Sequence, residues 1–302
     1  MKLYENIEDE RDRIQACINK FGHTSDHNLD WWACSAIDPD SLPVFVEWSD
    51  GIGLLAHHSK KEWRIWSDPV SPEKDMAETI GEFALEIFKD KNIEALWCDD
   101  ISDKIYPELK KNQNLKLNDV YYSLQWPVLN MLKYDPNLPG SHFKDIRNAR
   151  NKFYREHKVE VVKTDEVDKK LLHAIVDEWK NVALQKQKED VYDLKYHKAI
   201  DNNFRGFLTA RVLVAGGVPV GFNAGYEVVN SSGRFAGVIG INNYSINDLG
   251  LILWLEDLEW IKNAGYKELD MQGDEDGGLK FKMQFNPVIE RKTDTFCIKN
   301  NK

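Results

Sequence analysis

Gly240-Ile241-Asn242-Asn243-Tyr244-Ser245, followed closely by the apolar run from Leu249 to Leu255, is the stretch of sequence that decides the fold. It leads from a run of predicted strands into a predicted helix over residues 248–264. A strand that passes through a turn into a helix leaves several backbone N–H groups without a partner in the helix. Those groups and the helix dipole attract phosphate or a developing oxyanion. The turn is therefore the first candidate binding site.

The side chains of this turn add donors and acceptors to the backbone amides. Asn242, Asn243 and Ser245 could bind a phosphate, a pyrophosphate or a carbonyl, and Tyr244 could donate a proton to a leaving group. An alternative interpretation stays open, because Ser245 and Asp248 have the spacing of a capping box. On that interpretation the turn only caps a buried helix and binds nothing.

A second candidate is the glycine-rich acidic loop Asp270-Met271-Gln272-Gly273-Asp274-Glu275-Asp276-Gly277-Gly278, which follows a predicted strand. Its spacing does not match a calcium-binding EF-hand loop. Asp270 or Asp274 could orient and deprotonate an amine acceptor. Gly273 and Lys280 are candidates to bind substrate, and Lys282, just after the loop, is a candidate for the anionic side of the reaction. The alternative is an ordinary solvated loop.

A third candidate is the basic helix predicted over residues 141–158. Arg147 lies on its polar side, which could attract a lipid head group or the acceptor end of a transfer RNA, or could simply be solvated. Arg150 falls within the apolar stripe, where a guanidinium must either line a cleft or find an internal acidic partner.

Composition limits the classes of function. Hydrophobic residues make up 42% and charged residues 30% of the chain, as in a globular protein in water. No run of about 18 apolar residues predicts a transmembrane helix, and the charged stretch after Met1 does not resemble a secretory signal. The four cysteines are scattered, without a CxxC pair, which favours reduced thiols in a cytoplasmic protein.

Negative charge is concentrated in the first part of the sequence. Residues 1–130 hold 14 Lys and Arg against 25 Asp and Glu, a net charge of −11, and residues 131–302 hold 26 against 25, a net charge of +1. The first part should repel nucleic acid, so no DNA partner is expected, and an anionic ligand should bind in the second part. His23 and His27 have the spacing of a metal pair but lack a third ligand nearby, so no metal is expected.

The order of predicted elements repeats. Each part gives an opening helix, a block of strands, a polar turn, an apolar helix and a short strand, which predicts a tandem α+β protein. Asp135-Pro136-Asn137-Leu138-Pro139-Gly140 reads as a linker, so the two units are expected at residues 1–134 and 141–302.

Several motifs resemble those of phosphatidylglycerol lysyltransferases, in their C-terminal acyltransferase-fold domain, and more distantly those of the Fem peptidoglycan aminoacyltransferases. The matching pieces are Asn247-Asp248-Leu249-Gly250, Trp260-Ile261-Lys262-Asn263-Ala264-Gly265-Tyr266, Leu279-Lys280-Phe281-Lys282, Phe285-Asn286-Pro287, Ile146-Arg147-Asn148-Ala149-Arg150-Asn151-Lys152 and Ser67-Asp68-Pro69-Val70-Ser71-Pro72. Ser67 departs from the family's glycine, and the family's membrane flippase region is absent from this sequence.

The resemblance implies two tandem units of the GCN5-related N-acetyltransferase (GNAT) type, each a mixed central sheet flanked by helices. It implies transfer of an acyl or aminoacyl group, from aminoacyl-tRNA or acyl-CoA, to an amine or hydroxyl of a small-molecule, lipid or peptide acceptor. By the motif match, Lys282 would lie near the transferred group. The second unit is expected to be active and the first structural. Two alternatives stay open: a CoA-dependent N-acetyltransferase of a small molecule, and a non-catalytic binding protein of the same fold.

Overall fold

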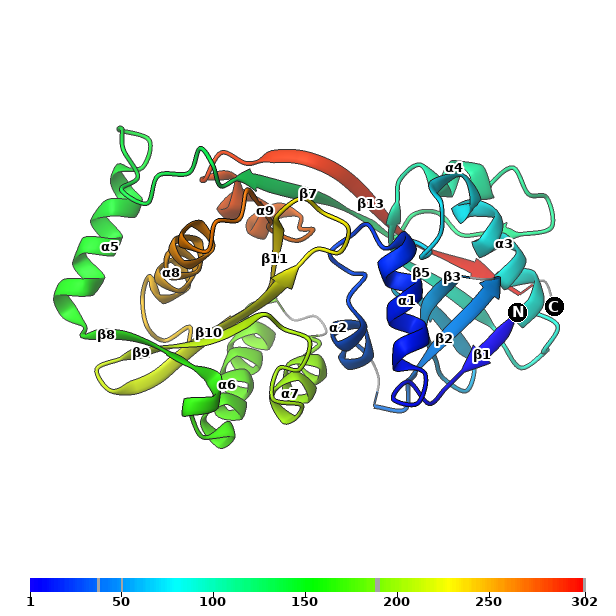
Figure 1. Cartoon of the computed structure of the whole chain (residues 1–302), viewed down its shortest axis with the longest axis horizontal. Coiled ribbons are helices and arrows are strands. Elements are labelled where there is room, and N and C mark those ends of the chain that lie inside the picture. The colour runs from blue at the N-terminus through cyan, green and yellow to red at the C-terminus, as the bar shows by residue number, and fades with distance from the viewer. Residues whose placement is uncertain (37–38, 50, 188–190, 301–302) are drawn as a thin grey trace. The chain divides into compact units, whose positions relative to one another are not determined.

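The computed structural model describes residues 1–36, 39–49, 51–187 and 191–300. The chain divides into two compact units (Figure 1). The first unit contains Met1–Val128, Val228–Ser231 and the segment from Gln272 onward, and the second contains Leu129–Glu227 and Ser232–Met271.

The first unit is a mixed sheet with helices on both faces. Its strands lie in the order β1, β2, β3, β4, β5, β13, β7, with β6 also paired to β13, and β4 with β5 is the parallel pair. The strands are β1 (Lys2–Tyr4), β2 (Leu42–Ser49), β3 (Ile52–His58), β4 (Glu62–Ile65), β5 (Ala95–Ser102), β6 (Lys116–Leu117), β7 (Tyr122–Asn130) and β13 (Val288–Lys299). The helices are α1 (Arg11–Phe21), α2 (Leu29–Cys34), the 3-10 turn η1 (Glu73–Asp75), α3 (Met76–Ile87), α4 (Ile105–Leu109) and α9 (Asp276–Met283).

Alternation along β2 and β3 builds two cores in this unit, because successive strand side chains point to opposite faces. Val44 and Leu54 pack with the apolar side of α3, whereas Phe45 and Leu55 pack with α1 and α2. Both sets are at most 1% exposed. Burial on both faces fixes the register of these strands, since a shift by one residue would exchange the two sets.

The second unit is also a mixed sheet, in the order β12, β11, β10, β9, β8, with β11 and β12 parallel. Its strands are β8 (Val159–Lys163), β9 (Thr209–Ala215), β10 (Val218–Glu227), β11 (Arg234–Asn242) and β12 (Glu268–Asp270). Its helices are α5 (Lys144–Glu156), the 3-10 turn η2 (Thr164–Glu166), α6 (Lys169–Gln187), α7 (Leu194–Asp201) and α8 (Leu249–Asn263). Helices α5 and α8 lie on one side of the strands, and α6 and α7 on the other (Figure 1).

Strand β10 shows how the second unit is packed. Phe222 contacts Phe204, which follows α7, with ring centroids 5.8 Å apart. The next residue, Asn223, points to the opposite face and donates from Nδ2 to the Leu253 carbonyl of α8 at 2.9 Å. On the same side, Arg211 of β9 forms an ion pair with the buried Asp257 of α8. Helix α8 is therefore held by polar contacts as well as by its apolar residues.

The tandem organisation expected from the sequence is confirmed by element order. β1-α1-α2-β2-β3-β4-α3-β5 in the first unit corresponds to β8-α6-α7-β9-β10-β11-α8-β12 in the second, if the 3-10 turns are left aside. In each unit the first four strands pair antiparallel and the fifth lies parallel to the fourth.

The unit boundaries differ from the division expected at 1–134 and 141–302. Strand β13 pairs with β5, β6 and β7 of the first unit, and its Phe296 and Ile298 belong to the core against α3. The sequence of the polar loop before β13 does not indicate that the chain passes there from the second unit back to the first. In the part of the chain that the structure describes, no helix is both long and apolar enough to cross a bilayer.

Candidate functional site

Lys282 is held beside Asp274 at the C-terminal turn of α9. Its Nζ atom lies 2.9 Å from Asp274 Oδ2 and donates to the Gln272 carbonyl at 3.1 Å, and its side chain is 13% exposed. The loop that carries Asp274 is fixed to β7, because Asp274 and Gln125 exchange two backbone hydrogen bonds of 3.0 Å. The structure thus brings together Lys282 and Asp274, two of the residues expected at a catalytic site.

Gly273 and Gly278 are needed for this arrangement. A Cβ atom on Gly278 would lie 2.1 Å from Asp274 Oδ2, and a Cβ atom on Gly273 would lie 2.7 Å from the Trp126 ring. Trp126 is itself fixed, since its Nε1 donates to Thr293 Oγ1 at 2.8 Å. Gly273 therefore allows the acidic loop to pack against Trp126, and its part in substrate binding stays a prediction.

Arg291 of β13 covers the ring of Trp126. Its guanidinium carbon lies 3.7 Å from the ring centroid, and its Nη2 atom lies 3.5 Å from Asp26 Oδ2. Asp26 is 7% exposed at its side chain and Arg291 is 24% exposed. A guanidinium stacked on an indole has a fixed plane and direction, so Arg291 is a preorganised cationic group.

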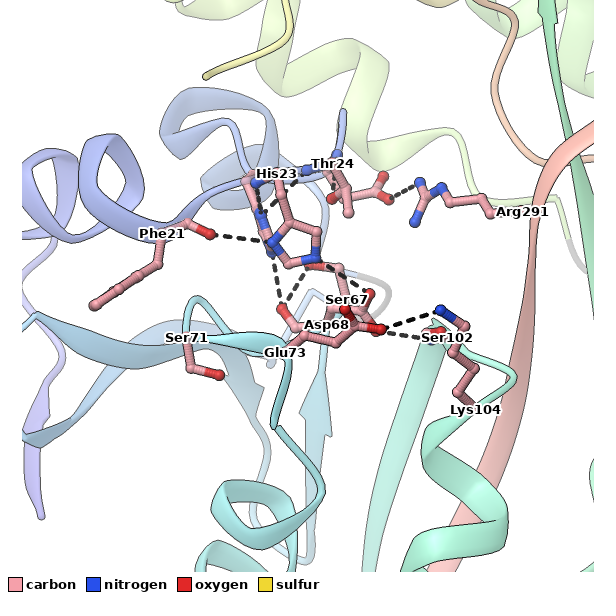
Figure 2. A network of polar contacts seen from close by, with 12 residues as sticks. Phe21, His23, Thr24, Ser67, Asp68, Ser71, Glu73, Ser102, Lys104 and Arg291 are labelled. Atoms are coloured by element: carbon pink, nitrogen blue, oxygen red, sulfur yellow. Dashed lines mark hydrogen bonds and ion pairs between the residues drawn. The ribbon is translucent and has the colours of Figure 1, made fainter. Parts of the chain in front are cut away.

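A network of polar groups lies at the carboxyl ends of the parallel strands β4 and β5 (Figure 2). Asp68 follows β4, and its Oδ1 accepts the Ser102 amide of β5 at 2.7 Å. His23, from the segment between α1 and α2, places Nε2 3.5 Å from Asp68 Oδ2 and Nδ1 3.1 Å from the Phe21 carbonyl. Glu73 and Lys104 pair at 3.1 Å on the exposed edge of this network.

The surroundings of His23 and Asp68 favour the charged form of each group. Burial opposes the imidazolium, but the hydrogen bonds to Asp68 and to the Phe21 carbonyl outweigh burial, so the pKa of His23 is raised. Burial likewise favours the neutral acid at Asp68, and the contacts from His23 and the Ser102 amide outweigh it, so the pKa of Asp68 is lowered.

His27 supports this pair as a neutral ring. Burial, followed by the nearby charge of His23, lowers the pKa of His27 to about 3. Its Nδ1 accepts the His23 amide at 2.9 Å, and its Nε2 contacts the Asp68 carbonyl at 2.8 Å. Both ring nitrogens are engaged, so His27 has no lone pair for a metal ion. The spacing of His23 and His27, which were not expected to bind a metal, brings the two rings into one hydrogen-bonded scaffold with Asp68.

The turn from Asn242 to Ser245, at the end of β11, is largely paired. The Asn243 amide donates to the Val220 carbonyl at 2.8 Å, and the Ser245 amide donates to Asn243 Oδ1 at 2.7 Å. Asn243 Nδ2 donates to Glu178 Oε2 at 2.7 Å. The expectation of open amides at Asn243 and Ser245 is therefore wrong, because the first amide pairs with β10 and the second with the side chain of Asn243. Tyr244 is 42% exposed.

The expected capping box is also absent. Helix α8 begins at Leu249, after Asp248 in a left-handed conformation at φ 63°, and no side chain caps it. Ser245 instead donates from its hydroxyl to Asn243 Oδ1 at 2.5 Å. Asn242 is 8% exposed at the end of β11 and lies against the start of α8, where a Cβ atom on Gly250 would be 3.2 Å from Asn242 Oδ1.

Strand β11 has an open edge near this turn. It pairs with β12 only from Arg234 to Ala236, although β11 continues to Asn242. Within the described residues, Gly237 to Asn242 therefore have no strand partner on that side. Backbone groups along such an edge can bind an extended ligand that contains amides.

The two arginines of α5 have structural partners. Arg147 donates to the carbonyls of Leu138 and Gly140, and Arg150 donates to the Pro136 carbonyl at 2.7 Å. The segment read as a linker is thus fixed to α5. These carbonyl contacts explain where both arginine side chains lie, without a carboxylate partner for Arg150 and without an open anion site. A part for either arginine in substrate binding stays a prediction.

Two further expected residues lie apart from these contacts. Asp270 ends β12 and is 3% exposed, so it is too buried to act without a rearrangement of its neighbours. Lys280 is exposed on α9 and lies on a different side of that helix from Lys282. Their catalytic and binding roles stay predictions.

Solved structures with the same fold cover nearly the whole chain. The C-terminal domain of a putative lysylphosphatidylglycerol synthetase from Agrobacterium fabrum is 14% identical, with a TM-score of 0.64 over 97% of this chain and 92% of that one. FemX is 11% identical, with a TM-score of 0.62 over 99% and 98%. A tandem GNAT protein from the clavulanic acid biosynthesis pathway is 11% identical, with a TM-score of 0.58 over 100% and 99%.

The chain has a tandem GNAT fold. The same fold occurs in the lysylphosphatidylglycerol synthetase domain and in FemX, so the resemblance inferred from the motifs is confirmed at the level of fold. No family model matches the sequence. A search of curated proteins finds no match either.

Residues of the first unit were missed as site candidates. Asp26, Asp68 and Arg291 come from separate segments and meet only through sheet topology. The one available signal was the turn Ser67-Asp68-Pro69, which matched a motif of the family and was interpreted as structural.

Proposed function

We propose that this protein is an acyl- or aminoacyltransferase that transfers a carbonyl-bound group to an amine or hydroxyl. The observation that carries the proposal is the open edge of β11 from Gly237 to Asn242, next to a turn that presents Tyr244. An extended peptide acceptor, which contains amides, could pair with this edge. The full-length likeness of fold to FemX and to the lysylphosphatidylglycerol synthetase domain supports the same class of reaction.

Lys282 and Asp274 are the proposed polar groups of the reaction. Acyl transfer requires a held acceptor, removal of a proton and stabilisation of an oxyanion. The Lys282 ammonium would stabilise the oxyanion, and Asp274 would orient the attacking amine and take its proton. The bond between the carbonyl carbon and the donor's oxygen or sulfur breaks as the new bond to nitrogen forms, and the donor's hydroxyl or thiol leaves with that proton. An acceptor ammonium would compete with Lys282 for Asp274, which would couple acceptor binding to release of the lysine.

Aminoacyl-tRNA is the donor that we favour over acyl-CoA. The turn that follows β11 lacks the arginine- and glycine-rich sequence that usually binds a pyrophosphate, and its Asn243 and Ser245 amides already have acceptors. We further propose a lipid or peptide acceptor and a reducing compartment such as the cytoplasm. All four cysteines are buried thiols outside any disulfide.

The test is a transfer assay with the wild-type chain. Transfer RNAs charged with labelled amino acids are incubated with the chain and with lipid or peptide acceptors, and thermal unfolding is measured with and without acetyl-CoA. Label in an acceptor, with no shift from acetyl-CoA, is the expected result. A shift and acetyl transfer would instead establish the CoA-dependent alternative.

A non-catalytic binding protein is the second candidate, and one observation favours it. That candidate predicts internal ion pairs at both Lys282 and Arg150, and Lys282 does pair with Asp274. Arg150 donates to a carbonyl. Ligand binding without turnover for any donor and acceptor tested would favour this candidate over the transferase.

A further inference from the structure

Helices α6 and α7 of the second unit pack against each other (Figure 1). They carry a cluster of histidines and carboxylates outside the proposed site. His197 Nε2 lies 3.4 Å from Asp193 Oδ2 and 3.5 Å from Asp177 Oδ1. One ligand atom from each of the three residues lies within 4.8 Å of the other two. Separations near 3.4 Å between ligand atoms fit bonds of about 2.0–2.2 Å from a central zinc ion to nitrogen and oxygen.

A second histidine determines which nitrogen of His197 carries a proton. His173 Nε2 lies 3.1 Å from Asp201 Oδ1, so this nitrogen is the donor to the carboxylate. His173 Nδ1 is then the acceptor of the neutral ring, and it lies 2.7 Å from His197 Nδ1. The ring planes are 15° apart, with centroids separated by 5.0 Å, which fits an in-plane hydrogen bond between the two Nδ1 atoms.

This chain of donors leaves a lone pair on His197 Nε2. The lone pair faces two carboxylate oxygens, so three acceptors converge with no proton between them. Such an arrangement requires either an additional proton or a cation. A histidine that donates its second ring N–H to a partner, itself held by a carboxylate, is the usual outer arrangement around a metal ligand.

The charges point the same way. Asp177, Asp193 and Asp201 carry three negative charges. Two lysines lie beside them: Lys180 pairs with Asp193 Oδ1 at 2.9 Å, and Lys169 donates to the Asp201 carbonyl at 2.9 Å. With neutral histidines and both lysines counted, the net charge of these groups is −1, so the cluster attracts a cation. Lys180 occupies Oδ1 of Asp193 and leaves Oδ2 toward His197.

We propose that His197, Asp193 and Asp177 bind a divalent first-row transition metal ion such as Zn²⁺. His173 and Asp201 are positioning residues that fix the proton of His197, and water completes the coordination. Two of the ligands come from α7 and its preceding turn and one from α6, so the ion joins the two helices. One imidazole with two carboxylates favours zinc or its neighbours over Ca²⁺ or Mg²⁺, which prefer oxygen ligands alone.

Calorimetric titration of the metal-free full chain with Zn²⁺ at about pH 7.5, where free imidazole is mostly neutral, tests the proposal. One equivalent should bind, and Zn²⁺ should raise the unfolding temperature. His197→Gln should weaken binding at least about tenfold, and the positioning variant His173→Asn by about 10–100-fold. His142→Gln, which changes an exposed histidine of the same unit, should bind Zn²⁺ as the wild type does.

Asp177→Asn keeps the test decisive if a histidine variant fails to fold, because Asp177 is 64% exposed and its change should leave the fold intact. It too should weaken binding. With Co²⁺ in place of Zn²⁺, visible absorption bands should appear in the wild type and change in His197→Gln. Binding without a single stoichiometric site, or equal affinity in His197→Gln and the wild type, would overturn the proposal.

Discussion

Lys282 Nζ lies 2.9 Å from Asp274 Oδ2, and these two residues belong to the same loop and helix after β12. The pair is nearly buried on the lysine side, with 13% of the Lys282 side chain exposed and 31% of the Asp274 side chain. The main chain of Asp274 is held by backbone hydrogen bonds to Gln125, which do not involve Lys282. Substrate binding can therefore act on Lys282 without changing the loop.

Replacement of Lys282 by alanine is expected to remove transfer activity while the fold persists. Loss of one group that stabilises an oxyanion commonly lowers the rate about 100-fold or more. Lys280→Ala is the matched control, since Lys280 is exposed on the same helix. Transfer rates of both variants measure activity, and circular dichroism checks that the fold persists. Equal rates for Lys282→Ala and the wild type would exclude Lys282 from the reaction.

Gly278→Ala is expected to disturb the contact between Lys282 and Asp274 by displacing the Asp274 side chain. Its Cβ atom would lie 2.1 Å from Asp274 Oδ2, so the carboxylate must turn away from Lys282. Gly277→Ala is the control, because no atom lies within 4 Å of a Cβ atom there. We expect Gly277→Ala to change the free energy of unfolding by less than about 1 kcal/mol and to keep activity. Equal activity of the two variants would contradict the role given to Asp274.

Arg211→Met is expected to destabilise the second unit by about 3–5 kcal/mol, because it leaves the buried Asp257 without its ion-pair partner. Burial lowers the pKa of Arg211 and raises that of Asp257, so desolvation outweighs attraction at each group. Replacing both residues by apolar ones should recover much of the loss.

Arg234→Met tests the same contact type at a more exposed position. Glu268, the partner of Arg234, is 43% exposed, so the expected loss is under about 1 kcal/mol. Urea denaturation measures both variants. An equal decrease in the free energy of unfolding for Arg211→Met and Arg234→Met would show that burial does not determine how much each ion pair contributes to stability.

Stability should fall with decreasing pH through His27. Its pKa is about 3 in the folded chain and about 6.5 when unfolded. Between these values the unfolded state binds the extra proton, so the free energy of unfolding falls by up to about 1.4 kcal/mol per pH unit as pH decreases. Urea denaturation between about pH 6.5 and 4 should show this slope in the wild type and a reduced slope in His27→Gln.

The contribution of His23 to the free energy of unfolding should depend on pH in the opposite direction from that of His27. Because the pKa of His23 is raised in the folded chain, its contribution is fully present below its unfolded pKa and is lost as pH rises through the folded pKa. The lowered pKa of Asp68 makes its contribution present above its unfolded pKa and lost as pH falls through the folded one. The difference between His23→Gln and the wild type should therefore be larger near pH 5 than near pH 8, and the reverse order would contradict the assignment.

Periodicity in the sequence predicted most of the fold. The helices expected over residues 141–158 and 248–264 occur as α5 (Lys144–Glu156) and α8 (Leu249–Asn263). Helix α2 was missed, because its six residues are too few to show a helical period. The placement of β13 was missed for another reason, since the partner of a strand depends on contacts far away in the chain.

The candidate site was harder to predict than the fold. Lys282 and Asp274 are near in sequence, so their contact could be expected from the loop and helix that carry them. Arg291 and Asp26 are distant in sequence, and nothing local relates them. The amides of Asn243 and Ser245 were expected to be open because sequence alone does not say where a turn finds its own acceptors.

The position of β13 in the sheet has a consequence for biosynthesis. Because this strand lies between β5 and β7 and supplies Phe296 and Ile298 to the core, the first unit stays incomplete until the ribosome has made the segment that follows the second unit. The first unit is thus mostly translated before the second unit, but it can complete its sheet only after the second unit has been translated. During synthesis the first unit therefore lacks the strand between β5 and β7 until β13 has been made. Its incomplete sheet is the state in which a nascent chain would depend on chaperones.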